Sequence, residues 1–145
     1  MSVSCVILAA GMGKRMNSST PKVLHRVLGT TMLGHVLRAA EGLNPGKLVI
    51  VAGKHMDMIK STVGNKNVSF ALQDEPRGTG HALLCARQLI GGLSDSIIVL
   101  NGDTPLITTH TLKRFLSLHR RRKDVLSVLS FVSSKPDDYG RFSGN

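Results

Sequence analysis

The sequence predicts a doubly wound α/β fold built on a mainly parallel sheet. Two observations predict this class. Short apolar runs alternate along the chain with amphipathic stretches of helical period. The runs are apolar on both faces, which is typical of strands buried in a parallel sheet. Helices between such strands cover both faces of the sheet through right-handed crossovers. A chain of 145 residues also suffices for one domain that buries a core without disulfides or a structural metal.

The individual elements follow from these patterns. The apolar runs predict strands over residues 3–9, 47–52, 67–72, 96–101 and 125–132. Apolar side chains at helical spacing predict helices over residues 32–43, 56–63, 82–90 and 112–116. No internal repeat interrupts this alternation. In a sheet of this kind a ligand binds beyond the carboxyl ends of the strands, so the loops that follow the strands are the candidate site.

The charge is strongly positive but unevenly placed. The chain has nineteen Lys and Arg and nine Asp and Glu, which gives a formal net charge of +10. Six of the basic residues lie between positions 113 and 123. Cations at the end of a helix favour its negative pole, which explains the cluster as a solvated helix end. Binding of single-stranded nucleic acid requires aromatic platforms, and the only nearby aromatic, Phe115, falls at a predicted core position. A specific nucleic-acid partner is therefore disfavoured.

Targeting and redox features are plain. No apolar run approaches the roughly 20 residues that span a bilayer, and the first residues lack the basic start and small-residue cleavage site of a signal peptide. We expect a cytoplasmic protein with no membrane partner. Cys5 and Cys85 suit no metal motif and are expected to be reduced, buried thiols.

The loop after the first strand has the composition of a phosphate cradle. Residues 8–25 read LAAGMGKRMNSSTPKVLH. Gly11 and Gly13 allow a close backbone approach to an anion, and Arg15 offers a fork of donors to phosphate oxygens. This loop matches neither the Walker pattern nor the dinucleotide-binding pattern. The loop is longer than a usual connection of two to six residues, which favours a function over a plain turn. Lys22 follows the rigid Pro21 and is a second phosphate clamp or an ordinary surface lysine.

Two further loops carry polar groups at strand ends. Asp103, in the NGDTP loop after the fourth run, is a candidate magnesium ligand or a cap ahead of Pro105. Gln73 opens the QDEPRGTGHA loop, and its amide can donate and accept against a base edge. Thr79 reads equally as the N-cap of the next helix. His81 is predicted to pack or cap rather than act as a base.

Together these motifs resemble a known family. The LAAGxGxRM motif of residues 8–16 with PKVLH at 21–25 is similar to the signature of sugar-phosphate nucleotidyltransferases. QxExxGTGHA from Gln73, GDxPL from Gly102 and YGR from Tyr139 narrow the resemblance. It then points to the uridylyltransferase domain of bacterial bifunctional N-acetylglucosamine-1-phosphate uridylyltransferases. Lys14, Pro76 and Asp138 depart from the family pattern.

The resemblance implies a reaction and a site. UMP would pass from UTP to N-acetylglucosamine-1-phosphate, giving pyrophosphate and UDP-N-acetylglucosamine, a cell-wall precursor, with Mg²⁺ as cofactor. Arg15 and Lys22 would clamp phosphates and Asp103 would hold the magnesium. Nucleotide and sugar contacts would come from Leu8, Ala9, Ala10, Gly11, Gly13, Lys22, Gln73, Gly78, Thr79, Asn101, Gly102 and Gly140.

The resemblance also sets the expected organisation. Residues 1–145 would form the nucleotide-binding half of such a domain, with neither the sugar-binding half nor the β-helix acyltransferase domain of the bifunctional enzymes. A noncatalytic nucleotide-binding or regulatory protein is the alternative function, with a basic nucleic-acid-binding module behind it. Homo-oligomerisation stays open, because a sheet edge left unpaired can pair with another chain.

Overall fold

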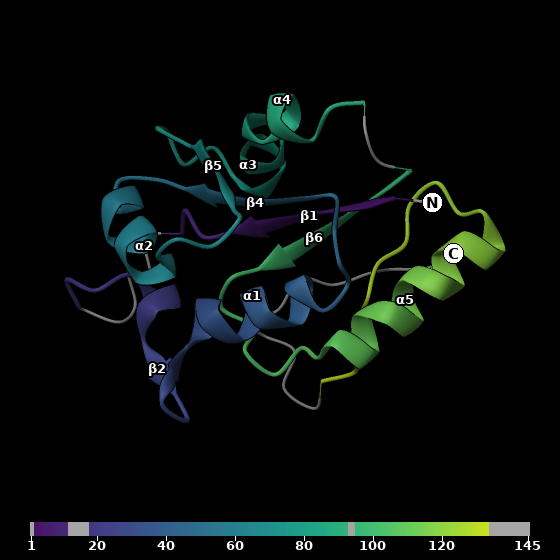
Figure 1. Ribbon diagram of the computed structural model, residues 1–145, viewed down its shortest axis with the longest axis horizontal. Coiled ribbons are helices and arrows are strands. Elements are labelled where there is room, and N and C mark those ends of the chain that lie inside the picture. The colour runs from purple at the N-terminus through teal and green to yellow at the C-terminus, as the bar shows by residue number, and fades with distance from the viewer. Residues whose placement is uncertain (1, 12–17, 93–94, 134–145) are drawn as a thin grey trace.

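A four-stranded parallel sheet forms the centre of the computed structural model, which describes residues 2–11, 18–92 and 95–133 (Figure 1). The strands are β1 (Val3–Leu8), β4 (Lys47–Ala52), β5 (Ser69–Leu72) and β6 (Ser96–Asn101), in the spatial order β5-β4-β1-β6. From β1 the chain moves outward through β4 to β5 and then returns to the opposite side of β1. The strand order therefore reverses between β1 and β6, where sheets of this type bind ligands at the carboxyl end. The predicted fold class is confirmed.

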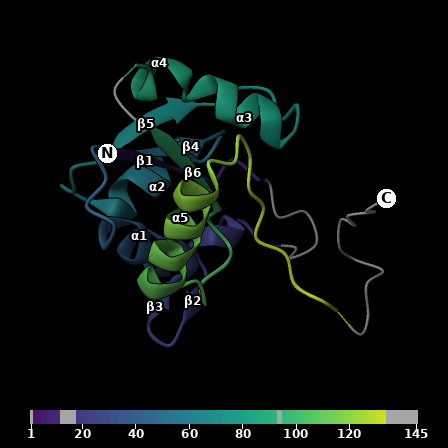
Figure 2. The same ribbon diagram turned by 90° about the vertical axis from the view of Figure 1, so that its right-hand side faces the viewer.

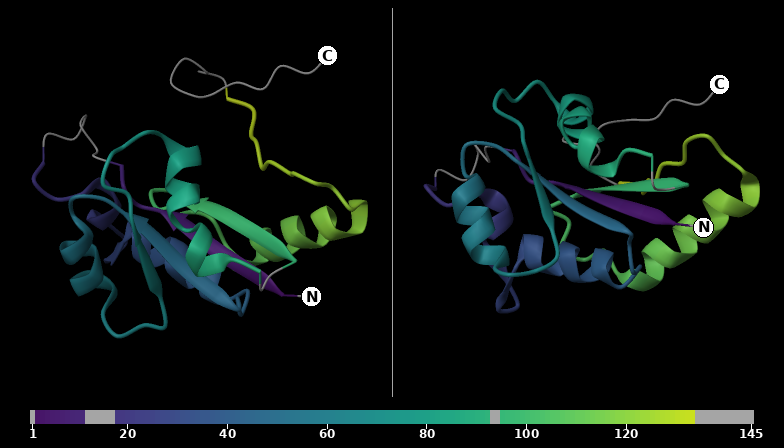
Figure 3. Two further views of the ribbon diagram at one scale, coloured as in Figure 1. Left: turned by 90° about the horizontal axis from the view of Figure 1, so that it is seen from above. Right: turned by 45° about the horizontal axis from the view of Figure 1, so that its top comes forward.

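Helices cover the sheet in two layers (Figures 1 and 3). On one side α1 (Met32–Glu41), α2 (Met56–Val63) and α5 (Thr109–Arg122) share a core with Ile7 and Ile50. On the other side α3 (Thr79–Cys85) and α4 (Arg87–Ile90) pack on Val6 and Val49. Successive residues of a strand point to opposite faces, so β1 and β4 supply both cores and must be apolar throughout.

The helices agree with their predicted positions, with one interruption. The structure divides the apolar stripe over residues 82–90 into α3 and α4, which meet at Ala86. Helix α1 begins at a Thr31 cap whose hydroxyl accepts from the Gly34 amide, and Thr108 caps α5 in the same way through the Thr111 amide. A threonine oxygen at this position satisfies an amide that has no partner within the helix.

A short hairpin after the first loop was absent from the predicted elements. The 3₁₀ turn η2 (Lys22–Leu24) leads into β2 (Arg26–Val27), which pairs antiparallel with β3 (Thr30–Thr31). Leu28 and Gly29 join the two strands with φ of 49° and 80°. Two successive positive φ values are typical of the tight hairpin turn whose twist matches that of its strands. Leucine rarely adopts such a φ, which is why the sequence did not predict the turn.

The fifth predicted strand, over residues 125–132, is wrong. The segment leaves α5 as extended chain and pairs with none of the described strands (Figure 2). Val125 and Val132 are fully exposed and Phe131 is 68% exposed. Its composition suits a strand, but a strand also needs a neighbour for its backbone groups, and β6 pairs only with β1 among the described residues. Ile97 and Val99 of β6 are half exposed on the same face as Val6, where α3 and α4 pack over β1 and β4.

The basic cluster lies where the sequence predicted it, at the end of a helix. The last turn of α5 holds His119, Arg120, Arg121 and Arg122, and Lys123 ends the helix with φ of 55°. Arg120 also donates to the Ser2 carbonyl at 3.0 Å. Cations at this pole stabilise the helix. None of the described helices is long and apolar enough to cross a membrane.

Candidate functional site

The predicted loops meet at the carboxyl edge of the sheet. Gly102, directly after β6, donates its amide to the Leu8 carbonyl at 2.9 Å. Ala9 donates to Val51 at 2.8 Å, which extends the ladder one residue beyond β1. On the far side of the sheet, the backbone N–H of Gln73 donates to the Ala52 carbonyl at 2.8 Å. Backbone hydrogen bonds therefore connect the ends of all four strands.

Two glycines let these loops approach one another closely. A Cβ added to Gly102 would lie 3.0 Å from the Leu8 carbonyl oxygen and 3.1 Å from a methyl group of Val23. A Cβ added to Gly53 would lie 3.2 Å from the Gln73 carbonyl oxygen. All three distances are tighter than ordinary van der Waals contact. Gly102 was among the predicted site residues and Gly53 was not, although a glycine directly after a buried strand was the available indication.

Lys22 and Asp103 form an ion pair at this edge. The Lys22 Nζ donates to Asp103 Oδ2 at 2.8 Å, and the two side chains are 43% and 34% exposed. Lys22 begins η2, whose next residues, Val23 and Leu24, are buried in the core. Because Val23 and Leu24 are buried, the backbone of Lys22 is held in place, as the preceding Pro21 predicted. The alternative of a free surface lysine is therefore disfavoured.

Asp103 does not cap the following turn. The side-chain bond that closes this turn comes from the Thr104 hydroxyl, which donates to the Asn101 carbonyl at 2.8 Å. The Asp103 carboxylate is left with Lys22 as its described partner. Of the two roles predicted for Asp103, the cap is not observed and the magnesium ligand stays a prediction.

Gln73 is the most buried polar side chain among the predicted site residues. It is 5% exposed, and its Nε2 donates to the Gly78 carbonyl at 3.1 Å. The same nitrogen lies 3.1 Å from His81 Nδ1. His81 does not cap α3, and its ring contacts the Gln73 side-chain amide.

Thr79 does not act as the N-cap of α3. Gly78 occupies that position with φ of 96°, and the helix start has no side-chain cap bond. A residue with a Cβ is strained at this φ, so glycine is required there. Leu8, Ala9, Ala10, Gly11, Asn101 and Thr79 lie at or next to the strand ends and the start of α3, as predicted. Gly13, Arg15 and Gly140 lie outside the described residues.

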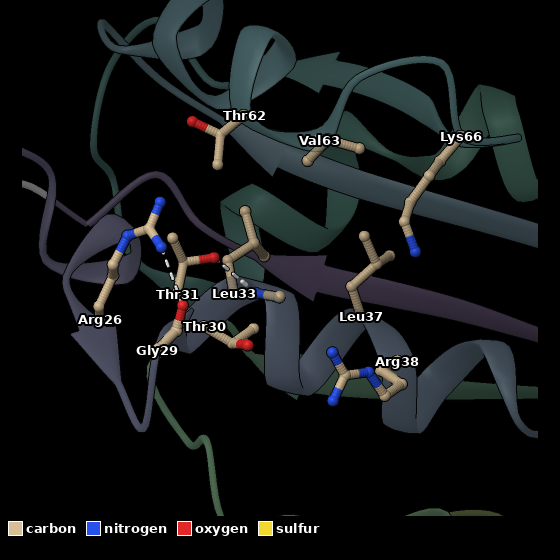
Figure 4. A pocket seen from close by; sticks show the side chains of 11 residues that line it. Arg26, Gly29, Thr30, Thr31, Leu33, Leu37, Arg38, Thr62, Val63 and Lys66 are labelled. Carbon is tan, nitrogen blue, oxygen red and sulfur yellow. Dashed lines mark hydrogen bonds between the residues drawn. The ribbon is translucent and has the colours of Figure 1, made fainter.

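A hollow of about 290 Å³ lies elsewhere, between the β2–β3 hairpin, α1 and α2 (Figure 4). Arg26, Arg38 and Lys66 line it together with apolar side chains such as Leu33 and Leu37. Lys66 pairs with Glu41 at 2.6 Å. None of the residues predicted for the nucleotide site lines this hollow. The described residues predicted for the nucleotide site therefore lie at the strand ends and the start of α3, outside this hollow.

The thiols differ in reactivity. Cys5 is fully buried in β1, and this burial raises the pKa of its thiol to about 12. A thiol with that pKa carries almost no thiolate at neutral pH and is chemically inert. Both cysteines are free, and Cys85 is only partly buried. The expectation of two reduced thiols agrees with this, whereas full burial holds for Cys5 alone.

Comparison with known proteins identifies the family. The family profile described as MobA-like NTP transferase domain matches residues 5–135. The chain is a MobA-like nucleotidyltransferase domain. This MobA-like domain is 42% identical over 140 residues to the bifunctional protein GlmU of Streptococcus suis and 41% identical over 145 residues to that of Streptococcus thermophilus. It spans about 30% of the length of these relatives. The resemblance predicted from the motifs is confirmed.

Solved structures agree with this assignment. Rv0371c from Mycobacterium tuberculosis superposes on the MobA-like domain with a TM-score of 0.73 and 25% identity, over 83% of this chain and 61% of that one. A nucleotidyl transferase from Methanothermobacter thermautotroptrophicus gives a TM-score of 0.68 at 23% identity, over 80% of this chain and 57% of that one, and shows the fold alone.

Proposed function

We propose that this domain binds UTP and transfers UMP to N-acetylglucosamine-1-phosphate, forming UDP-N-acetylglucosamine and pyrophosphate. Membership in the nucleotidyltransferase family supports the class of reaction. The motifs shared with uridylyltransferases support the substrate pair. The observation that carries the proposal is the continuous carboxyl edge, where Gln73 lies at one end and the Lys22–Asp103 pair at the other.

The two ends of this edge suit the two ends of a nucleotide. Near β5, the buried Gln73 amide and the Gly78–Thr79 backbone would hold the uracil, together with the backbone of residues 8–11. Near β6, Asn101 and Gly102 would face the ribose and sugar, joined by Gly140. Gly13, Arg15 and Lys22 would bind the phosphates.

The transfer itself needs positioning and charge neutralisation rather than a side-chain nucleophile. An oxygen of the sugar phosphate attacks the α-phosphorus of UTP, the bond from that phosphorus to the bridging oxygen breaks, and pyrophosphate leaves with the electron pair. Negative charge builds up on the phosphate oxygens as this happens. The ammonium of Lys22 and the guanidinium of Arg15 would stabilise that charge.

The residues present fit a divalent metal at Asp103. Its carboxylate gives one oxygen to Lys22 and has no second described partner. No group of three or more His, Cys, Asp and Glu gathers as a metal site within residues 2–11, 18–92 and 95–133. A magnesium ion here would therefore take its other ligands from nucleotide phosphates and water, as is usual for this cation. When bound, it would neutralise charge on the phosphates.

We further propose that residues 1–145 act as the nucleotide-binding half of the transferase. The 30% share of the GlmU relatives that the chain matches is their N-terminal nucleotidyltransferase part by the motif resemblance. Sugar recognition is then the function for which this half contributes least.

The direct test combines two measurements on one sample. Pyrophosphate release is followed with UTP, N-acetylglucosamine-1-phosphate and Mg²⁺, and UTP binding is titrated by calorimetry. We expect magnesium-dependent UTP binding. Pyrophosphate release shows that these residues suffice for turnover, whereas binding without release supports the alternative of a noncatalytic nucleotide-binding protein.

A variant with less positive charge tests the third candidate function, a nucleic-acid-binding module. Replacing Arg121 and Arg122 with alanine alters the exposed end of α5 and leaves the carboxyl edge intact. Retention on heparin should fall while UTP binding stays unchanged. Absence of UTP binding in the unmodified chain, with specific DNA binding that these changes abolish, would overturn the proposal in favour of a nucleic-acid-binding module.

A further inference from the structure

The orientation of the Gln73 amide follows from its partner at Gly78. The Gly78 carbonyl oxygen lies 3.1 Å from one terminal atom of the side chain, and a carbonyl oxygen can only accept. The atom that faces it is therefore the amide nitrogen. Gly78 is itself held by its position before α3 and by the Ala82 amide, which donates to the same carbonyl at 3.1 Å. The acceptor that orients Gln73 is thus part of the backbone.

The orientation of Gln73 in turn fixes the proton on His81. The Nδ1 of His81 lies 3.1 Å from the same amide nitrogen. An amide nitrogen has no lone pair to offer, so Nδ1 must accept and the neutral ring carries its proton on Nε2. That nitrogen lies 4.0 Å from the Sγ of Cys85, one helical turn further on, and the sulfur is a weak acceptor.

Both hydrogens of the Gln73 amide are thereby used inside the protein. The side-chain oxygen of Gln73, Oε1, accepts no hydrogen bond from the described residues. A base that reaches Gln73 therefore meets a hydrogen-bond acceptor. Uracil presents a donor at N3, whereas cytosine presents a lone pair there.

We propose that His81 is a positioning residue that makes this site select uracil over cytosine. The inference rests on the proposed function, because it requires a nucleotide at the carboxyl edge. To accept cytosine, the Gln73 amide must turn over. It then loses its bond to Gly78 and places its oxygen against that carbonyl, and His81 keeps a bond to Gln73 only if its proton moves from Nε2 to Nδ1. Without the His81 acceptor, only the Gly78 bond opposes this rotation.

The test compares UTP with CTP, which share the triphosphate and ribose, so that the ratio of their dissociation constants reports the base alone. In His81→Phe the ring is kept and the acceptor is lost. One net hydrogen bond is worth about 1 kcal/mol, so the preference for UTP should fall about fivefold. His81→Asn returns an oxygen near the position of Nδ1 and should restore most of the preference. A purely structural role would weaken both nucleotides equally and leave the ratio unchanged, and that result overturns the proposal.

A second measurement needs no variant. Long-range ¹H–¹⁵N spectra of the unmodified chain report which nitrogen of each neutral histidine ring is protonated. The proposal requires His81 to carry its proton on Nε2, and a proton on Nδ1 contradicts it even if His81→Phe fails to fold. If the unmodified chain binds neither UTP nor CTP, the proposed function fails and the selectivity role fails with it. If UTP binds and the ratio does not move, only the role of His81 fails.

Discussion

Replacing Lys22 with methionine should separate folding from function at the carboxyl edge. The variant keeps the length and apolar stem of the side chain and removes the ammonium that donates to Asp103 at 2.8 Å. If the pair exists to serve a ligand, stability should barely change while triphosphate binding falls. If it exists to hold the fold, the reverse should be seen.

The exposure of the two side chains sets the expected size of each effect. They are 43% and 34% exposed, so solvent screens the pair and its loss should cost less than about 1 kcal/mol. For a chain of this length that is a fall of at most about 4 °C in melting temperature. A hydrogen bond to a charged group is worth about 1.5–3 kcal/mol, so UTP should bind about 10- to 100-fold more weakly.

The assay measures urea unfolding and calorimetric UTP titration on the variant and on a matched control. Lys113→Met removes the same charge from an exposed position on α5, a helix that carries none of the predicted site residues, and should change neither quantity appreciably. Asp103→Asn should also leave stability nearly unchanged and remove the magnesium dependence of UTP binding. Loss of several kcal/mol of stability in Lys22→Met, or UTP binding equal to that of Lys113→Met, would contradict a ligand-binding role for Lys22.

Three other predictions concern the fold around the site. Gly102→Ala forces a Cβ to within 3.0 Å of the Leu8 carbonyl and should lower the free energy of unfolding by about 1–3 kcal/mol. Gly11→Ala, whose added Cβ has nothing within 4 Å, should change the free energy of unfolding little. Equal values for the two variants in urea titrations would contradict the tight approach at Gly102. Ile98→Thr, at a 5% exposed position, should destabilise by about 2–4 kcal/mol, and Ile97→Thr, at 48%, by about 0.5 kcal/mol or less; similar losses in thermal unfolding would mean that the β6 face is covered. Iodoacetamide at pH 8 should modify Cys85 and spare Cys5 until the chain unfolds, because burial raises the pKa of Cys5 to about 12; rapid native labelling of Cys5, detected by mass spectrometry, would count against a closed core.

Much of the sheet could be predicted because its physical cause is local. In β1 and β4 nearly every side chain is buried, so the sequence shows continuous apolar runs that a parallel sheet requires. Helix α2 follows the same logic with helical spacing and has the predicted bounds. Polar groups directly after such strands must fall on one edge, which is why Gln73 and Asp103 were found.

The failures have non-local causes. The apolar segment over residues 125–132 looks like a strand, yet strand formation depends on a neighbouring chain that the local pattern does not reveal. The part played by His81 arises from its contact with Gln73 across a loop, and helical spacing gave only its place beside an apolar stripe. At α3, Thr79 was one candidate for the N-cap because of its side chain, but Gly78 holds that position and its backbone conformation governs the turn.

Amide chemical shifts recorded while UTP and Mg²⁺ are added would test most directly whether the strand ends form one nucleotide site. The largest changes should fall on residues 8–11, 73–79 and 101–103, which the structure joins at the carboxyl edge. Changes confined to residues 113–123 at the basic end of α5, or to the residues that line the hollow beside α1, would contradict it.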